Sequence, residues 1–481
     1  MSNTARSNIT LIRGLGLVAA IAIVVGNVIG TGVFLKARVM TCNVGTPGKV
    51  MAVWVAAGLL SLAGALTYAE LAAMMPRAGG EYVFIREAYG APWGFLYGWM
   101  SFFIGKAGSQ AALAVGLAIF LNDLTGGALS AEYFTLDLRF ITVPFGALQV
   151  VALAAIAIVT LINCAAVYVS GHVAAVLTGI KIALVLAVGC GAFLLARGDW
   201  AHLGMTGAGG VCEGVEESAR IGMAGFGAAM LGALWAYDGW NNVTLVAGEV
   251  KDPQRNIPLA LIGGTILVGA LYVFVNLAYF YVLTPVEIAS VPKASSVAAE
   301  VARQFLGPVA VSLIAAAMLT SSFGTLHTSV LTGARVPYAM SRDRLFFQSL
   351  SRISPRTHVP TGALILQGVW SSLLALSGSF DALTDYAIFG LWIFYGLTTA
   401  SVFVFRSRMP EAARPYRAWG YPVVPVLFLL VTLWLLGSTL RATPGKALTG
   451  LGLIALGLPV YWYWSRYNRV AYQEPPQKDE D

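Results

Sequence analysis

The stretch GNVIGTG at positions 26–32 places glycines and polar residues inside a long apolar run. Glycine weakens a helix by about 0.8–1 kcal/mol relative to alanine, so the cluster predicts a break between two half-helices. A break leaves backbone N–H groups free where one half-helix begins and C=O groups free where the other ends. N–H ends attract anions and C=O ends attract cations. The stretch therefore indicates a site for a small charged ligand, although small residues at this spacing also allow close helix packing.

A second polar, glycine-bearing patch, GALWAYDGWNN at positions 232–242, interrupts another apolar run and contains Asp238. A carboxylate within a membrane-spanning run costs about 2.5–3.5 kcal/mol on insertion scales, so its presence requires a reason. Paired interruptions at corresponding positions are the best sequence indication of a transport site. The pairing favours a binding site over plain packing at 26–32.

Composition places both stretches in a membrane. The chain has 481 residues, of which 58% are hydrophobic and only 11% are charged, whereas soluble proteins carry about 25% charged residues. The net charge of +7 comes without a dense basic patch interleaved with aromatic residues, so no nucleic-acid partner is expected. The lipid bilayer is the expected surrounding.

Apolar runs between charged or turn-rich segments predict an all-α polytopic membrane protein with about twelve spanning helices. The predicted spans are residues 14–40, 48–72, 92–121, 142–166, 171–196, 221–249, 258–283, 306–331, 360–378, 382–405, 421–440 and 447–465. Most of the 30 Lys and Arg residues fall in segments that are cytoplasmic if the N-terminus is inside. The positive-inside rule therefore predicts that both termini are cytoplasmic, in a cell inner or plasma membrane.

The two interruptions lie in spans one and six, so corresponding repeats hold five helices each. Because five is odd, the second repeat enters the membrane from the opposite face and forms an inverted pair with the first. The predicted segments are a cytoplasmic N-terminus (1–13), a first repeat (14–196), a second repeat (221–405), two extra helices (419–466) and a disordered cytoplasmic tail (467–481).

The polarity of the half-helices predicts the chemistry of the ligand. The half-helix that begins near Gly32 points N–H groups and its positive dipole end into the gap, which suits a carboxylate. The half-helices that end near Val28 and Trp235 point C=O groups there, which suits an ammonium. The Thr31 hydroxyl adds a donor for the carboxylate. Both charges together fit a zwitterionic α-amino acid.

The chain resembles the amino acid–polyamine–organocation superfamily, and within it the L-type amino acid transporters, similar to the light subunits of heteromeric amino acid transporters. The resemblance rests on GNVIGTGVF (26–34), PRAGGEYVFIREAYG (76–90), the Lys106 region, WAYDGWNNVTLVAGEVKDPQRNIPLALIGG (235–264), RVPYAMSRDRLFF (335–347) and RPYRAWGYPVVP (414–425). It implies a LeuT-type fold of five plus five inverted helices, with helices 1 and 6 discontinuous and two further helices at the C-terminus. It also implies alternating access, often as an exchanger.

The family pattern implies how a substrate would be held. The substrate carboxylate would sit on the backbone amides of Gly30, Thr31 and Gly32. The substrate amino group would face the carbonyls of Val28, Trp235 and Asp238.

The family pattern also suggests residues that gate the site and select the substrate side chain. The Trp235 ring would act as a gate, and Asn241 would help to hold the unwound part of span six. An aspartate at the position of Asp238 also occurs in family members that accept cationic amino acids. Lys106 lies where some relatives that accept anionic or cystine-like substrates carry a basic residue. The alternative is that Asp238 and Lys106 pair with each other. In that case both are structural and indicate little about the substrate.

Lys181, in the predicted fifth span, matches a lysine that several relatives place against the broken first helix. A fixed ammonium there would satisfy carbonyls that bind Na⁺ in sodium-coupled members, which would make the protein sodium-independent. The alternative is a lysine that snorkels to the inner surface.

The 4 cysteines are Cys42, Cys164, Cys190 and Cys212, and they lack metal-ligand spacing, so neither a metal nor another cofactor is expected. Cys42 and Cys212 both fall on the predicted outer side, which leaves a disulfide between them open. In eukaryotic relatives a cysteine between spans three and four links a glycoprotein. The segment 122–140 contains none, so no disulfide-linked glycoprotein subunit is expected.

The sequence predicts a secondary active transporter of α-amino acids that exchanges neutral L-amino acids without sodium, with cationic L-amino acids as a further substrate class. A proton- or sodium-coupled symporter and a cationic amino acid or polyamine transporter of the same fold are the alternatives. The chain contains no HExxH or GxSxG motif and no clustered His and Asp set, so an enzyme is not expected. A sensor that binds an amino acid without transporting it stays open.

Overall fold

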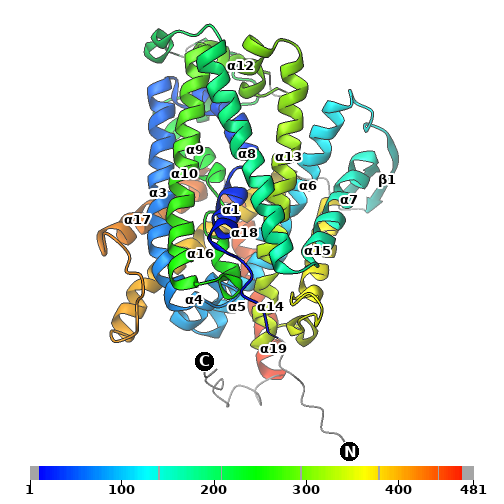
Figure 1. The fold of residues 1–481 in the computed structure, drawn as a ribbon, viewed down its shortest axis with the longest axis vertical. Coiled ribbons are helices and arrows are strands. Elements are labelled where there is room, and N and C mark those ends of the chain that lie inside the picture. Colours follow the sequence, from blue (N-terminus) through cyan, green and yellow to red (C-terminus); the bar gives the residue numbers. More distant parts are fainter. Residues whose placement is uncertain are drawn as a thin grey trace, which may run out of the picture.

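The structure is a computed structural model that describes residues 10–138, 141–206, 209–292, 295–376, 380–442 and 444–467. These residues form an elongated bundle of helices with one small β-hairpin on its side (Figure 1). Most of the predicted N-terminal segment (1–13) and of the predicted disordered tail (467–481) lies outside the described residues.

The elements follow one another along the chain as mostly long helices joined by short connections. They are α1 Leu17–Val28, α2 Gly32–Val44, α3 Pro47–Met74, α4 Glu81–Tyr89, α5 Ala91–Met100, η1 Ser101–Lys106, α6 Ala107–Leu124, β1 Glu132–Leu138, β2 Ile141–Gly146, α7 Ala147–Asn163, α8 Val167–Leu195, η2 Trp200–Gly204, η3 Glu217–Ala219, α9 Gly222–Ala236, η4 Asn242–Glu249, α10 Pro253–Val282, α11 Pro285–Ser290, α12 Val297–Leu306, α13 Val309–Gly333, α14 Arg335–Arg342, η5 Gln348–Ser351, α15 Thr361–Leu376, α16 Phe380–Arg408, α17 Val423–Ala442, α18 Pro444–Ala455 and α19 Gly457–Tyr467.

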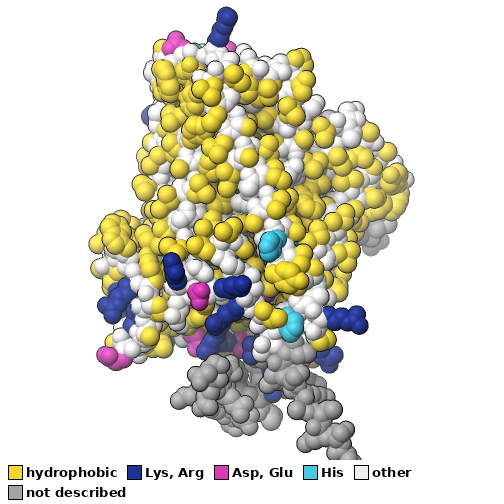
Figure 2. All heavy atoms as spheres, in the orientation of Figure 1, with side chains coloured by type: hydrophobic (Ala, Val, Ile, Leu, Met, Phe, Trp, Pro, Cys, Tyr) yellow, Lys and Arg dark blue, Asp and Glu magenta, His cyan; other side chains and the backbone are white. Residues whose placement is uncertain are grey.

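Among the described residues, 9 helical segments are long and apolar enough to cross a membrane, and α7, α9 and α15 are shorter apolar helices. Hydrophobic side chains cover most of the side of the molecule, whereas Lys and Arg gather near the end that holds α4 and α14 (Figure 2). We call this end the α4 end, and the opposite end, where α12 lies, the α12 end (Figure 1). An apolar side between polar ends is what a polytopic membrane protein presents to lipid.

Helix α1 lies among other helices and contacts α8, α10 and α13, while α2 packs on α9. The chain leaves helical geometry at Ile29, which has φ −72° and ψ 91°, directly after α1 ends at Val28. Helix α9 ends at Ala236, and the next helical segment is the 3₁₀-helix η4, which begins at Asn242. Each glycine-bearing stretch therefore contains a gap between two helical segments.

The segment between α5 and α6 is a π-helix, η1, that ends at Lys106. A π-helical turn shifts the register of all later side chains by one position and is frequent at functional sites. It directs Lys106 toward the interruption between α9 and η4, where its ammonium makes the contact described below.

The predicted span 142–166 begins later than expected, because a short β-hairpin precedes it in the otherwise helical bundle. Strands β1 and β2 pair in antiparallel fashion, and α7 begins only at Ala147. The residues Ile141, Thr142 and Val143 are β-branched, which favours a strand, and Pro144 cannot continue a helical hydrogen-bond ladder. The hairpin stands on the side of the bundle beside α7 (Figure 1).

Candidate functional site

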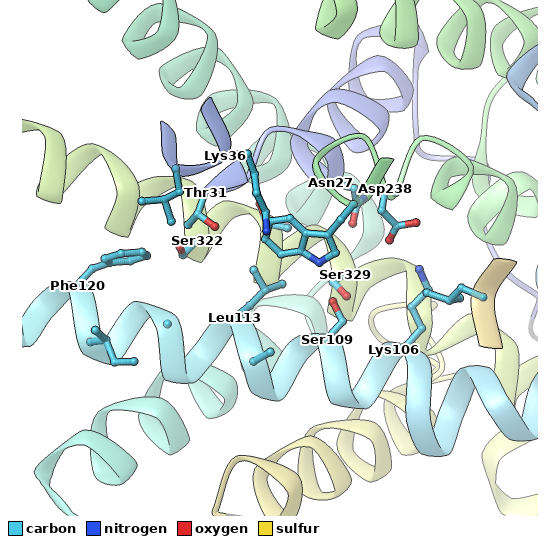
Figure 3. Close-up of a pocket in the computed structure, with 18 of the residues that line it drawn as sticks. Asn27, Thr31, Lys36, Lys106, Ser109, Leu113, Phe120, Asp238, Ser322 and Ser329 are labelled. Atoms are coloured by element: carbon cyan, nitrogen blue, oxygen red, sulfur yellow. The ribbon is translucent and has the colours of Figure 1, made fainter. Parts of the chain in front are cut away.

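A cavity of about 510 Å³ lies beside the two interruptions and is shown in Figure 3. Its walls come from the α1–α2 connection, the end of α9, α6 and α13. Four of the residues that line it are predicted site residues, namely Thr31, Lys106, Trp235 and Asp238. The cavity continues along α2, past Leu35 and Val39. This part of the cavity lies toward the α12 end, where α2 contacts α11 and α12.

The backbone amides of Gly30, Thr31 and Gly32 are the predicted carboxylate site. Among the described residues, none of the backbone or side-chain hydrogen bonds uses these three N–H groups. The carbonyl of Thr31 accepts instead from Phe34 and Leu35, over 3.1 and 3.2 Å, as the first turn of α2 forms. Three unused donors at a helix N-terminus form an arrangement that suits an anion.

Two of the three carbonyls predicted to face the substrate amino group, those of Val28 and Trp235, already take part in internal contacts. The Tyr272 hydroxyl donates to the Val28 carbonyl over 2.9 Å and lies 3.0 Å from the Ala236 carbonyl. The Asp238 amide donates to the Trp235 carbonyl over 3.2 Å. A carbonyl oxygen has two lone pairs, so the Val28 carbonyl retains one acceptor position, whereas the Trp235 carbonyl also accepts from the Tyr237 amide. Tyr272, which the sequence reasoning missed, bridges the ends of the two interrupted helices.

Lys181 is 1% exposed, so its side chain does not snorkel to a surface. Its ammonium donates to the Gly26 carbonyl over 2.7 Å, to the Ile29 carbonyl over 2.8 Å and to the Thr325 hydroxyl over 2.7 Å. All three ammonium protons therefore have acceptors around the break in α1. The Ser321 hydroxyl also donates to the Ile29 carbonyl, over 3.1 Å. Helix α13 thus contributes Ser321 and Thr325, which were not among the predicted site residues.

Asp238 and Lys106 make no ion pair with each other in this structure; both residues lie in the described part of the chain. Asp238 accepts from the Tyr395 hydroxyl over 2.7 Å, and the Lys106 ammonium donates to the Asn242 side-chain oxygen. Both side chains face the same cavity (Figure 3). The direct pair that the sequence left open is therefore replaced by two separate contacts.

Asn241, predicted to help to hold the unwound part of span six beside the selectivity residues, is 2% exposed and is not among the residues that line the cavity. Its side-chain amide donates to the buried carboxylate of Glu81 at the start of α4. The neighbouring Asn242 lines the cavity instead. Sequence reasoning missed Glu81, although it lies in the GGEY part of the 76–90 motif.

The Trp235 ring lies against the cavity with the Lys36 ammonium 4.7 Å from its centroid. Figure 3 shows the Lys36 side chain at the cavity, on the same side as Thr31. A cation over an indole face is attracted by the ring quadrupole, by about 0.5–1 kcal/mol at exposed sites and more when desolvated. Lys36 was not among the predicted site residues, because its place on the inner face of α2 depends on where that helix begins.

A buried ion pair joins elements at the α4 end of the bundle. Arg335 and Glu249, both 0% exposed, form a two-bond ion pair at 2.7 and 2.8 Å. The Leu15 amide donates to the Glu249 carbonyl over 2.9 Å, which ties the chain before α1 to the end of η4. Separating such a buried pair is unfavourable, because each charge would then be buried without its partner.

A second contact at the α4 end joins α4 to the residue after α14. Arg86 forms an ion pair with Asp343, and the Tyr82 hydroxyl donates to the same carboxylate over 2.7 Å. Burial, together with the neighbouring Asp343 carboxylate, raises the pKa of Tyr82 well above its ordinary value. The hydroxyl therefore stays protonated and remains a donor at any physiological pH.

At the α12 end, Cys42 and Cys212 form a disulfide. It joins α2 to the segment before α9, and the Asn43 carbonyl next to it accepts from the Ile221 amide over 2.7 Å. The Arg38 guanidinium donates to the Glu213 carbonyl over 2.6 Å. The half-helix α2 is therefore fastened to the loop that leads into α9.

Comparison with known proteins identifies similar chains along nearly the whole length. Residues 15–456 match the family model described as Amino acid permease. The serine/threonine exchanger SteT of Bacillus subtilis (strain 168) is 31% identical over 452 residues, which cover 94% of this chain and 96% of that protein. The human b(0,+)-type amino acid transporter 1 is 30% identical, covering 95% of this chain and 89% of that protein. The human large neutral amino acids transporter small subunit 2 is 29% identical, covering 95% and 82%.

Proposed function

This chain belongs to the amino acid permease family, and we propose that it is a secondary transporter that exchanges α-amino acids across the cytoplasmic membrane without sodium. Neutral L-amino acids are the principal substrates and cationic ones a second class. The observation that carries the proposal is the set of unused amides at Gly30, Thr31 and Gly32 beside the cavity. They form an anion site next to carbonyls and a carboxylate that suit an ammonium.

The proposed architecture is a LeuT-type bundle of twelve spans. The 9 candidate spans of the described residues and the shorter helices α7, α9 and α15 supply them. Spans one to five (14–196) and six to ten (221–405) form inverted repeats whose interrupted helices meet at the site, and 419–466 adds two more spans. The gathering of Lys and Arg at the α4 end supports a cytoplasmic α4 end with both termini inside (Figure 2).

The proposed conformational state is outward-facing. Its support is the cavity that runs along α2 toward the α12 end, while the buried pair of Arg335 and Glu249 joins elements at the α4 end. Alternating access then requires the reverse arrangement, in which the contacts at the α4 end separate and the α12 end closes over the substrate.

Sodium independence is proposed from Lys181. Its ammonium occupies acceptors at Gly26, Ile29 and Thr325, which are oxygen atoms of the kind that would bind a sodium ion. A permanently tethered cation would stabilise the break in α1 in every step of the cycle. Transport would then draw on the gradient of the counter-substrate rather than on sodium.

Each remaining site residue receives a proposed role. Trp235 closes over the substrate as a gate, with Lys36 against its ring. Asp238 and Lys106, which carry opposite charges, both face the substrate side chain. Asn241 supports the interruption between α9 and η4 through its contact with Glu81.

The test is counterflow in proteoliposomes made from the purified full-length chain. Liposomes loaded with unlabelled alanine should accumulate labelled external alanine in sodium-free buffer, and empty liposomes should not. Uptake that requires a sodium or proton gradient and ignores internal amino acid would instead identify a coupled symporter. Competition by the twenty amino acids and by a polyamine would separate a neutral exchanger from a cationic amino acid or polyamine transporter. Saturable binding without any flux would identify a sensor.

We also propose that the chain works without a disulfide-linked partner subunit. One relative is named a small subunit, but in this chain Cys42 and Cys212 are joined to each other. Electrophoresis of the membrane fraction from its native cell, with and without reductant, tests this proposal. A reductant-sensitive species heavier than one chain would contradict it.

A further inference from the structure

Three ionisable side chains from different elements gather beside the cavity, and their charges do not cancel. The Lys106 ammonium lies within electrostatic reach of the Asp238 and Glu81 carboxylates. Glu81 is 1% exposed and Lys106 is 7% exposed, while Asp238 stands at the cavity wall. With all three ionised, the cluster carries one net negative charge.

The other titratable groups that face this cluster are phenols. They are Tyr68 of α3, Tyr97 of α5 and Tyr395 of α16. A buried phenol is neutral at physiological pH, so these groups leave the net charge of the cluster unchanged.

Two further lysines of the site serve other groups. Lys181 lies on the far side of the α1 break with its ammonium on Gly26, Ile29 and Thr325, and Lys36 lies over the Trp235 ring. Among the described residues, Lys106 is the basic group within electrostatic reach of Asp238. The positive charge available to the two carboxylates is therefore that of Lys106.

Glu81 is the carboxylate that the fold supports as an anion. It accepts from the Asn241 amide, from the Tyr97 hydroxyl over 3.1 Å and from the Thr244 hydroxyl over 3.5 Å. Several donors to a carboxylate favour its ionised form. It also lies at the first residue of α4, where the helix dipole favours an anion. Glu81 does not line the cavity, so it is a fixed negative charge behind the cavity wall and shares the Lys106 charge with Asp238.

Asp238 is the carboxylate of the cluster that faces the cavity, and it shares the single Lys106 charge with Glu81. Its side chain accepts one hydrogen bond from a side chain, that of Tyr395, and it faces the cavity (Figure 3). While the cavity is open, water there can solvate this charge. When the site closes around a substrate, that water is lost, and an uncompensated carboxylate in a dry interior is strongly unfavourable.

We propose that the site closes only when one positive charge has been added at Asp238, which makes the cluster neutral. This charge is supplied in one of two ways. With a neutral amino acid, the Asp238 carboxylate takes a proton from water on the entry side and returns it to water on the exit side. With a cationic amino acid, the side-chain ammonium or guanidinium takes the place of that proton. This inference rests on the proposed exchange function and states how many protons cross the membrane with each class of substrate.

The proposal makes exchange between the two substrate classes electroneutral. When external lysine enters and internal alanine leaves, one positive charge enters on lysine and one leaves as the proton that accompanies alanine. The liposome lumen should therefore become more alkaline by about one proton per lysine taken up. Exchange of alanine for alanine should move no net proton, because the inward and outward protons balance.

The experiment uses proteoliposomes loaded with alanine and an internal pH-sensitive dye, with the membrane potential set by potassium and valinomycin. External lysine should raise the internal pH in proportion to labelled lysine uptake, at a rate that the potential does not alter. Lysine uptake that follows the potential without a pH change would overturn the proposal, as would failure of lysine to exchange where alanine does. Failure of alanine to exchange for alanine would instead reject the proposed exchange function.

Two variants test the charge count. Asp238→Asn and Glu81→Gln each remove one negative charge, the first at the cavity wall and the second behind it. Both should abolish the lysine-driven pH change, and both should lower lysine uptake relative to alanine uptake by about tenfold or more. Glu287→Gln, at an exposed carboxylate of α11, is the control and should leave the proton count at one. A count that stays at one in either cluster variant would overturn the proposal.

Discussion

Gly239 lies in direct contact with Asn27, so that a Cβ atom on Gly239 would stand 2.9 Å from the Asn27 Cβ atom and 3.3 Å from its carbonyl oxygen. The φ angle of Gly239 is +101°, which side-chain-bearing residues rarely adopt. The two interruptions therefore meet backbone to backbone. Gly32 makes a second close approach between the two interruptions, because a Cβ atom on Gly32 would stand 2.7 Å from the Ala236 Cβ atom.

Gly30→Val should abolish substrate binding while the protein still folds. A Cβ atom at Gly30 meets nothing closer than the Thr325 hydroxyl at 3.9 Å, so the bundle has room for a side chain. The branched side chain would instead cover the unused amides and exclude a carboxylate. We expect affinity for alanine to fall at least tenfold in a thermal-shift or scintillation binding assay, with an unchanged melting temperature of the ligand-free protein. Gly437→Ala, where a Cβ atom has open space, is the control. Wild-type affinity in Gly30→Val would contradict the site geometry.

Lys181→Met should lower exchange by about tenfold or more. Removing the ammonium leaves the carbonyls of Gly26 and Ile29 short of a donor in a buried place, and an unsatisfied buried polar group costs about 1–3 kcal/mol. Initial rates of labelled alanine counterflow provide the measurement. Lys251→Met, at an exposed residue before α10, should keep the wild-type rate. Wild-type exchange by Lys181→Met would show that the tethered ammonium is dispensable.

Glu249→Gln should destabilise the protein through Arg335. Breaking one side of a buried ion pair leaves the other charge uncompensated, typically at about 3–5 kcal/mol, and both side chains here are 0% exposed. Thermal unfolding in detergent should show a clearly lower midpoint. The double variant Glu249→Leu with Arg335→Met should regain much of the loss, because it buries no charge. A double variant less stable than Glu249→Gln would contradict this explanation.

Reduction of the disulfide between Cys42 and Cys212 should destabilise the α12 end. A disulfide commonly contributes about 2–4 kcal/mol by restricting the unfolded chain, and this one bridges a separation of 170 residues. The melting temperature of the purified protein should fall on reduction and in Cys42→Ser, whereas Cys190→Ser, at an exposed free cysteine, should melt like wild type. Peptide mapping without reductant should recover the two cysteines linked. Separate, alkylated peptides from the untreated protein would contradict the pairing.

Much of the bundle was predictable because lipid imposes a simple rule on sequence. A span needs about 20 apolar residues, so the long helices α3, α8 and α10 stand out in the sequence as apolar runs. The hairpin β1–β2 was not predicted, since short apolar segments do not distinguish strand from helix by periodicity alone. Its Pro144 was the available signal against helix.

The site was predictable in its backbone and much less so in its side chains. Glycines mark where a helix is weak, which located both interruptions. The partners of charged side chains depend on helix rotation and crossing, which local sequence does not encode. Lys106 therefore donates to Asn242 rather than pairing with Asp238, and Glu81 reaches Asn241 from a separate helix.

The sequence by itself determined that the chain lies in a membrane, that two of its apolar runs are interrupted, and that the breaks suit opposite charges, because composition and helix propensity are local properties. Only the tertiary structure decided which groups satisfy one another across the bundle. Lys181 meets Gly26 and Ile29, Tyr272 bridges Val28 and Ala236, and Asp238 is left facing the cavity. These contacts join segments far apart in the chain, and a buried charge is governed by what surrounds it in space.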